Sequence, residues 1–136
     1  MTFLLDTNAF SDLMREHSAF EKRLAGLSEN DAVVLCTVVR GEILFGLLRL
    51  EPGKRRSELE SKAGKLFAAI PCEPISETAA AHYAKTKQSR QTKGLALDEN
   101  DLWIAACALA LPATLVSRDS DFRQIDGLNV EDWTKA

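Results

Sequence analysis

Short apolar runs alternate with longer segments of helical periodicity along the whole chain. The runs end at polar or turn-forming residues, which is typical of strands buried in a sheet. We predict strands at residues 2–5, 32–36 and 113–117, with weaker strands at 72–75 and 128–130. Because helical segments separate these strands, the pattern indicates β-α units and a mostly parallel sheet.

Six helices are expected between the strands. The first begins near Asn8, and the others cover about 19–27, 37–50, 54–69, 77–91 and 100–111. Pro52 ends the third helix and Pro112 ends the sixth, because proline interrupts helical hydrogen bonding. Ser76 is a suitable N-cap for the fifth helix. The pattern therefore predicts a single α/β domain over residues 1–136.

Composition narrows the class of protein. The chain has 136 residues, 46% of them hydrophobic, which is enough for one domain with its own core. No apolar stretch approaches a membrane span and no export signal stands at the N-terminus, so we expect a cytoplasmic protein. Cys36, Cys72 and Cys107 lack metal-binding spacing and are expected to be reduced core residues. The formal charge of −3 argues only weakly against a nucleic-acid partner, because bound metal would screen several carboxylates.

Four acidic residues stand where an apolar core would not favour them. Asp6 and Asp119 follow predicted strands, whereas Glu42 and Asp101 fall within predicted apolar helices. Burying several unpaired carboxylates together costs free energy and raises their pKa values. A divalent cation between them would remove that cost. Because functional groups gather at the carboxyl ends of parallel strands, the four acids predict one metal site.

Each acid taken alone also has a structural explanation. Asp6 or Asn8 could cap the first helix, Asp101 could cap the sixth, and Asp119 could form an Asx turn. Glu42 fits such an explanation least, because residues 38–45 are apolar enough to be buried on most sides. The joint placement of the four acids is what favours a metal site.

Helical periodicity orients one of these acids. Asp101 shares a stripe with Ile104, Ala105 and Ala108, so its side chain should face the sheet. Its place in the first helical turn favours the ionised carboxylate that a metal requires. Asp98, three residues earlier, is its main competitor for the ligand role.

The ligand types indicate the metal and the chemistry. A site whose ligands are all oxygen atoms favours hard cations, so Mg²⁺ or Mn²⁺ is expected and zinc is disfavoured. Acidic clusters that hold such ions suit phosphodiester hydrolysis, in which the metal acidifies a water molecule and stabilises charge on the phosphate. The chain has no G-x-S-x-G elbow and no phosphate-binding P-loop, in agreement with hydrolysis that needs no protein nucleophile.

Four segments resemble the successive motifs of PIN-domain ribonucleases. They are residues 4–8, 40–46, 101–106 and 115–122, in the family's order. Residues 125–133 are similar to the tail of VapC-type toxins in particular. The resemblance implies a three-layer α/β/α fold and a Mg²⁺- or Mn²⁺-dependent endoribonuclease. It also implies a homodimer, and a cognate antitoxin protein that inserts a segment near the active site.

The same resemblance assigns site residues. The family's catalytic and metal-ligating positions fall on Asp6, Thr7, Asn8, Glu42, Asp101, Ser117 and Asp119. Of these, the four acids would hold the metal. Thr7 or Ser117 would orient a ligand by hydrogen bonding, although turn and cap chemistry explains them equally well. Relatives vary in whether the last acid falls at Asp119 or nearer Asp121, and Asp119 is favoured because it lies closer to the strand end.

Basic side chains outside the acid cluster would hold the RNA. Arg118 lies inside the last motif, and a guanidinium can bind a phosphate through two N–H groups at once. Most other lysines and arginines are expected to be solvated surface. Trp103 is expected in the core or at an interface. We expect cleavage within a single-stranded loop of a structured RNA, such as a transfer or ribosomal RNA.

Two other classes of protein fit parts of the sequence. A phosphatase of the haloacid-dehalogenase type also begins with a strand ending in Asp, but it needs a second Asp two residues later, where this chain has Asn8. A non-catalytic, receiver-like interaction domain fits the sheet but gives no reason for Glu42 within an apolar helix. Metal binding would separate this last class from the enzyme.

Overall fold

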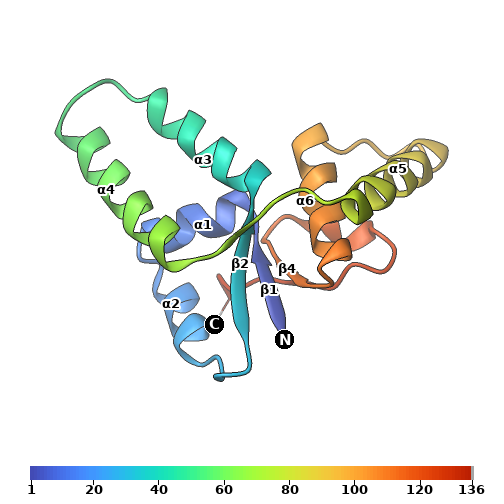
Figure 1. The fold of residues 1–136 in the computed structure, drawn as a ribbon, viewed down its shortest axis with the longest axis horizontal. Coiled ribbons are helices and arrows are strands. Elements are labelled where there is room, and N and C mark those ends of the chain that lie inside the picture. The colour runs from blue at the N-terminus through green and yellow to red at the C-terminus, as the bar shows by residue number, and fades with distance from the viewer. Residues whose placement is uncertain (136) are drawn as a thin grey trace.

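A five-stranded parallel sheet forms the centre of the protein. The computed structural model describes residues 1–135. The strand order is β3-β2-β1-β4-β5, and every pair of neighbours is parallel. The strands are β1 (Thr2–Leu5), β2 (Ala32–Cys36), β3 (Cys72–Glu73), β4 (Thr114–Val116) and β5 (Val130–Glu131). This architecture confirms the predicted α/β class, with the strands at the middle of the ribbon (Figure 1).

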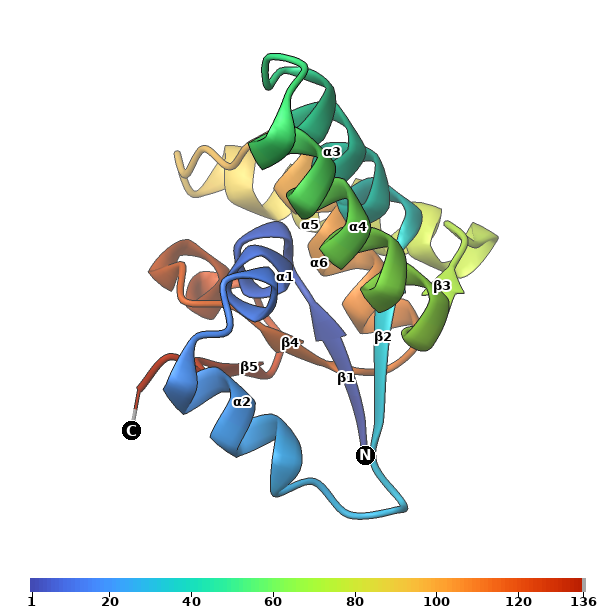
Figure 2. The ribbon, with the colours of Figure 1, turned by 90° about the vertical axis from the view of Figure 1, so that its left-hand side faces the viewer.

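Six helices and one 3-10 turn surround the sheet. They are α1 (Thr7–Met14), α2 (Ser18–Ala25), α3 (Thr37–Leu48), α4 (Lys54–Ala69), α5 (Glu77–Thr92), α6 (Glu99–Ala110) and η1 (Ser120–Gln124). Helices α3 and α4 pair on one side of the strands, and α5 and α6 pair on the other (Figure 1). Helix α1 contacts both α3 and α4, which lie above it when the molecule is turned (Figure 2).

The predicted elements differ from the observed ones mainly at their ends. Strand β3 has two residues instead of the four predicted, because Pro71 and Pro74 bracket it and proline cannot donate a ladder hydrogen bond. Ser76 caps α5 as predicted, and its hydroxyl accepts from the N–H of Ala79. Helix α6 begins one residue earlier than predicted, because the side chain of Asp98 caps it.

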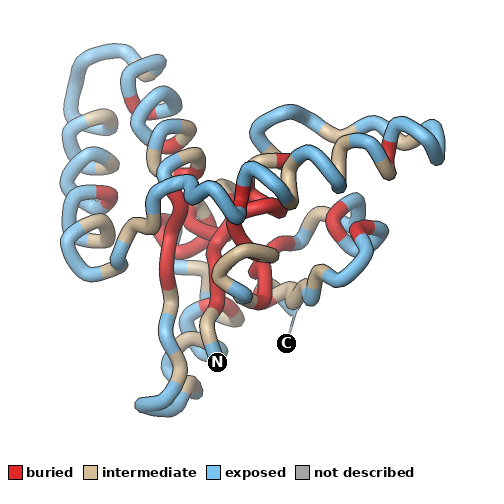
Figure 3. Tube along the Cα trace, turned by 45° about the vertical axis from the view of Figure 1, so that its right-hand side comes forward, coloured by how far each residue is buried: buried red, intermediate tan, exposed pale blue. Residues whose placement is uncertain are grey.

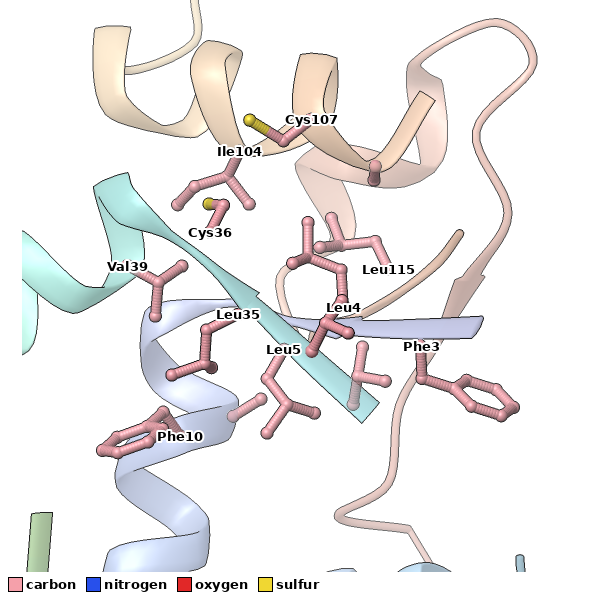
Figure 4. Close-up of a cluster of buried hydrophobic side chains, with 14 of the residues drawn as sticks. Phe3, Leu4, Leu5, Phe10, Leu35, Cys36, Val39, Ile104, Cys107 and Leu115 are labelled. Atoms are coloured by element: carbon pink, nitrogen blue, oxygen red, sulfur yellow. The ribbon is translucent and has the colours of Figure 1, made fainter. Parts of the chain in front are cut away.

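The buried core runs through the sheet. Residues in the upper parts of β1, β2 and β4 are buried, whereas the outer turns of the helices are exposed (Figure 3). Strands covered on both faces are apolar at successive positions, as Leu4 and Leu5 are. Ile104 of α6 packs on one side of these strands, and Phe10 of α1 packs on the other (Figure 4). The sheet therefore lies between two helical layers, which confirms the three-layer α/β/α fold.

Helix α3 is much less buried than predicted. Only Val39, Ile43 and Leu47, spaced four residues apart, are buried on it. Leu44 and Phe45 expose 44% and 62% of their surface, so the prediction that residues 38–45 are buried on most sides was wrong. The apolar sequence was misleading because α3 extends beyond the sheet (Figure 1) and buries one face only.

Two expectations from composition can be compared with the structure. Within residues 1–135, no helix has the length and apolar character needed to cross a membrane. The three cysteines are unpaired thiols; Cys36 and Cys107 are buried, as expected, and Cys72 is half-buried.

Candidate metal centre

The topology brings the predicted acids to one edge of the sheet. Asp6 directly follows β1, and the segment Ser117–Asp119 directly follows β4, which is the parallel neighbour of β1. Glu42 lies in the second turn of α3, which starts where β2 ends. Asp101 lies in the first turn of α6. The carboxyl ends of three adjacent strands and the starts of their helices therefore surround one site.

Asp6 is the most buried acid of this site, with 4% of its surface exposed. Its Oδ1 accepts from the N–H of Ala9 at 2.7 Å and thereby caps α1, as one of the structural explanations predicted. Burial raises the pKa of the Asp6 carboxyl, a hydrogen bond from the Ser117 hydroxyl lowers it, and the nearby Asp119 and Asp12 raise it further. Asp6 is thus both a helix cap and a carboxylate among other carboxylates.

Asp101 carries the clearest electrostatic signature of the site. Its pKa is raised from 3.8 to about 6, mainly by burial and further by repulsion from four carboxylates. The four repelling groups are, in order of effect, Asp98, Glu42, Asp119 and Asp6. Within residues 1–135, no basic side chain forms an ion pair with any of these five acids. The site therefore concentrates negative charge without a counterion.

Glu42 is held by two polar side chains from other elements. The hydroxyl of Thr7 donates to its Oε1 at 2.5 Å, and the amide nitrogen of Asn100 donates to its Oε2 at 3.3 Å. Thr7 belongs to α1 and Asn100 to α6, so Glu42 of α3 joins three helices. The hydrogen bond from Thr7 agrees with the orienting role predicted for that residue.

Asp119 and Ser117 form the fourth corner of the site. Asp119 Oδ1 accepts from the N–H of Asp121 at 2.9 Å, which is the Asx turn weighed as its structural explanation. The N–H of Asp119 donates to the Ser117 hydroxyl at 3.0 Å, and that hydroxyl in turn donates to Asp6. Ser117, which is almost fully buried, therefore links the two strand ends that carry Asp6 and Asp119.

The donor set fits a hard divalent cation. Its ligating atoms would all be carboxylate oxygens, and their mutual repulsion is what such an ion relieves. In the part of the chain that the structure describes, no three acidic, histidine or cysteine side chains already converge as ligands do. Asp6, Glu42 and Asp119 each accept one of the hydrogen bonds described above through a carboxylate oxygen. An ion would take the place of some of these donors.

Comparison with known proteins decides the family. The family model of the PIN domain matches residues 3–128. The chain belongs to the PIN-domain family. This membership decides against the phosphatase and receiver-like alternatives.

Relatives within the PIN family match the chain over almost its full length. Ribonuclease VapC1 of Haemophilus influenzae strain R2866 is 31% identical over 140 residues, covering 99% of this chain and 100% of the relative. Ribonuclease VapC2 of Rickettsia felis is 27% identical, with the same coverage of both chains.

Solved structures of PIN-domain proteins share the fold. VapBC2 from Rickettsia felis, bound to a DNA fragment from its promoter, superposes with a TM-score of 0.89 at 26% identity and covers 98% of this chain and 99% of that one. VapBC-1 from nontypeable Haemophilus influenzae gives a TM-score of 0.88 at 28% identity, covering 99% and 100%. The PIN architecture therefore extends over the whole described chain.

Within residues 1–135, neither Asn8 nor Arg118 forms an ion pair with the acids proposed to hold the metal. Asn8 is exposed on the first turn of α1, and its side chain makes no hydrogen bond within residues 1–135. Arg118 pairs through Nε with Asp12 at 3.6 Å. Asp98, the proposed competitor of Asp101, uses an oxygen to cap α6 through the N–H of Asn100.

Sequence reasoning missed two residues of this PIN site, Asn100 and Asp12. Asn100 directly precedes Asp101, so its position next to the family's third motif was a usable signal. Asp12 carries no such signal, because an acid six residues after Asp6 on a short helix usually faces solvent. Only the fold shows that Asp12 is buried and lies close enough to raise the pKa of Asp6.

Proposed function

We propose that this PIN domain is a Mg²⁺- or Mn²⁺-dependent endoribonuclease and the toxin of a toxin–antitoxin pair. The observation that carries the metal dependence is the group of carboxylates around Asp101, which have no basic partner within residues 1–135. Among them, Asp101 has its pKa raised to about 6. The ribonuclease activity is inferred from the relatives, which are named as VapC ribonucleases. Their full-length match supports carrying this activity over to the present chain.

The site residues would have separate roles in holding the metal, orienting its ligands and contacting the substrate. Asp6, Glu42, Asp101 and Asp119 hold the metal through their carboxylate oxygens. Thr7 and Ser117 keep Glu42 and Asp6 in place through the hydrogen bonds already described. Such an ion would supply positive charge that stabilises the phosphate, and it would lower the pKa of a water molecule so that hydroxide is available to attack. Asn8, exposed at the start of α1, is proposed to contact substrate.

The proposed substrate is a single-stranded loop of a structured RNA, such as a transfer or ribosomal RNA. The acids lie at the ends of strands and helices, where half-buried side chains such as Glu42 and Asp101 remain reachable from solvent. A loop exposes phosphates and unstacked bases to such a site, whereas paired stems shield them.

The antitoxin partner is proposed to occupy a cavity beside the acids. This cavity of about 510 Å³ lies between α1, α3 and α4 and includes Thr7 and Glu42 in its wall. Apolar residues such as Ile43 and Leu47 line it, with Arg15 and Arg55 among its charged residues. Related chains have been solved as VapBC toxin–antitoxin complexes, which supports a protein segment as the occupant. The homodimer stays a prediction.

Mapping of cleavage sites tests this function. Labelled total cellular RNA would be incubated with the protein in Mg²⁺, in Mn²⁺ and in chelator, and the new ends sequenced. We expect a small number of cuts within loops, no cuts in chelator, and little activity on duplex DNA. Cuts spread evenly over stems and loops would contradict the proposed substrate, and full activity in chelator would contradict the proposed metal.

A further inference from the structure

The segment that carries Ser117 and Asp119 also carries an arginine with an unusual contact. Arg118 pairs through Nε with Oδ2 of Asp12 at 3.6 Å. Asp12 lies on α1, and its side chain is only 5% exposed, whereas that of Arg118 is 45% exposed. One end of this ion pair is therefore inside the protein and the other reaches the surface next to the acid cluster.

The geometry of the pair is poor for stability. Asp12 Oδ2 is buried and has no hydrogen-bond partner within residues 1–135, since 3.6 Å is too long for a hydrogen bond from Nε. Taking a carboxylate out of water is costly unless hydrogen bonds and good geometry repay it. A leucine or alanine at position 12 would suit the apolar face of α1 better. The pair is therefore better explained by where it places Arg118 than by the stability it adds.

The contact leaves most of the guanidinium free. Within residues 1–135, neither Nη group of Arg118 donates to an acceptor, and Asp12 is the only acid that pairs with it. Asp119 and Asp121, which closely follow Arg118 in the chain, form no ion pair with it. A mobile arginine among so many carboxylates would be drawn to them and would compete with a cation for their oxygens.

We propose that Asp12 is a positioning residue that holds Arg118 for substrate. Because Asp12 pairs with Nε, the two Nη groups of Arg118 remain available to bind an RNA phosphate beside the acids. The same pairing prevents the guanidinium from contacting the metal-binding carboxylates. A guanidinium fixed in this way binds phosphate with less loss of side-chain freedom. This inference rests on the proposed ribonuclease function.

The test is a double-mutant cycle on the pair. Asp12→Asn, Arg118→Gln and the double variant would be compared with wild type for RNA cleavage in Mn²⁺. Each single change should raise KM by about tenfold and leave kcat within about twofold, because one charged phosphate contact is lost or misplaced. The double variant should be no worse than either single variant, since both act through one contact.

A second measurement does not depend on cleavage. Anisotropy of a labelled single-stranded RNA in chelator should show weaker binding by all three variants and a salt dependence reduced by about one unit of slope. Arg23→Gln is the matched control, because Arg23 is similarly exposed and also pairs with a carboxylate, that of Glu131. It should behave as wild type.

The outcomes separate the two proposals. Wild-type protein that binds RNA without cutting it would contradict the ribonuclease function. The anisotropy measurement would still test the role of Asp12 in that case. Additive losses in the double variant, or a fall in kcat at unchanged KM, would overturn the positioning role. Arg118→Lys covers the case in which Asp12→Asn does not fold. An ammonium presents all its donors from one nitrogen, so it cannot pair with Asp12 and also bind a phosphate in the bidentate geometry of a guanidinium. A wild-type KM for this variant would therefore also overturn the positioning role.

Discussion

Glu99 and Asp101 lie two residues apart in the first turn of α6, yet their environments are opposite. Glu99 is exposed and accepts hydrogen bonds from the Tyr83 hydroxyl and the Lys87 ammonium, which lower its pKa. Asp101 is half-buried beside four other acids, and burial followed by their repulsion raises its pKa to about 6. Both carboxylates feel the same helix N-terminus, which favours the ionised form of each.

The difference shows how the site is built. Lys87 stands on α5, which packs along α6, so the fold does place a counterion beside this helical turn. Lys87 pairs with Glu99, whereas Asp101 has no basic partner in the part of the chain that the structure describes. A carboxylate that is satisfied within the protein has little affinity left for a cation, whereas an unpaired group of carboxylates gains by binding one. The missing counterion on the Asp101 side is therefore the feature that indicates function.

The largest expected effect separates these two residues in catalysis. Asp101→Asn should lower the rate of RNA cleavage by about a hundredfold or more, because Asp101 is a proposed ligand of the catalytic ion. Glu99→Gln should leave the rate nearly unchanged. Initial rates on one labelled RNA at saturating Mn²⁺ measure both. Equal activity of Asp101→Asn and wild type would instead favour Asp98 as the ligand.

Metal-dependent stability should follow the same division. An ion that binds only the folded protein stabilises it by about 2.7 kcal/mol at a concentration about a hundred times its Kd, so Mn²⁺ should raise the Tm by several degrees. Thermal melts with and without the ion would show the gain in wild type and in Glu99→Gln, and a smaller gain in Asp119→Asn. A Tm that changes with neither Mn²⁺ nor Mg²⁺ would contradict a metal site.

The pH dependence of stability should have opposite signs for the two residues in metal-free protein. The folded pKa of Asp101 is raised from 3.8 to about 6, so folding favours its protonated form and the free energy of unfolding should fall as pH rises from about 4 to about 6. The folded pKa of Glu99 is lowered from 4.5, so its contribution is present above pH 4.5 and is lost as pH falls.

Denaturant unfolding in chelator across this pH range measures both slopes. Asp101→Asn should remove the decline between pH 4 and 6, and Glu99→Gln should keep it. A wild-type curve that rises through this range by as much as the Asp101→Asn curve would mean that Asp101 is not perturbed in solution.

The smallest effect is expected for the satisfied carboxylate itself. Glu99→Gln removes an exposed ion pair with Lys87, and exposed pairs contribute little because water screens them. Its Tm should differ from that of wild type by little more than the error of the melts. A large decrease in Tm would show that the contacts among Glu99, Lys87 and Tyr83 stabilise the packing of α5 on α6.

Much of the fold follows from local patterns. The bounds of β1, β2 and α4 agree with the predicted ones, because hydrophobic periodicity and turn residues define them within a few positions. The placement of Asp6 and Asp101 was also predictable, since each stands at the end of an apolar element that must reach the sheet. The exposed face of α3 was not predictable, because an apolar helix gives no sign of how far it extends beyond its neighbours.

Contacts between distant segments account for what the sequence did not reveal. Asn100 reaches Glu42 across 58 positions of the chain, and nothing near either residue predicts that hydrogen bond. Trp103 was expected in the core or at an interface; it is half-buried and stacks on Tyr83 of α5, with ring centroids 3.9 Å apart. The ion pair of Asp12 with Arg118 likewise joins two distant segments, α1 and the residues that follow β4.

Calorimetric titration with Mn²⁺ tests the central claim most directly, because it measures the ion rather than its consequences. Wild type and Glu99→Gln should bind Mn²⁺ with the same Kd, and Asp101→Asn should bind it at least about tenfold more weakly. Wild-type protein that takes up no Mn²⁺ at millimolar concentration, or Asp101→Asn that binds as tightly as wild type, would contradict a metal centre among these unpaired carboxylates.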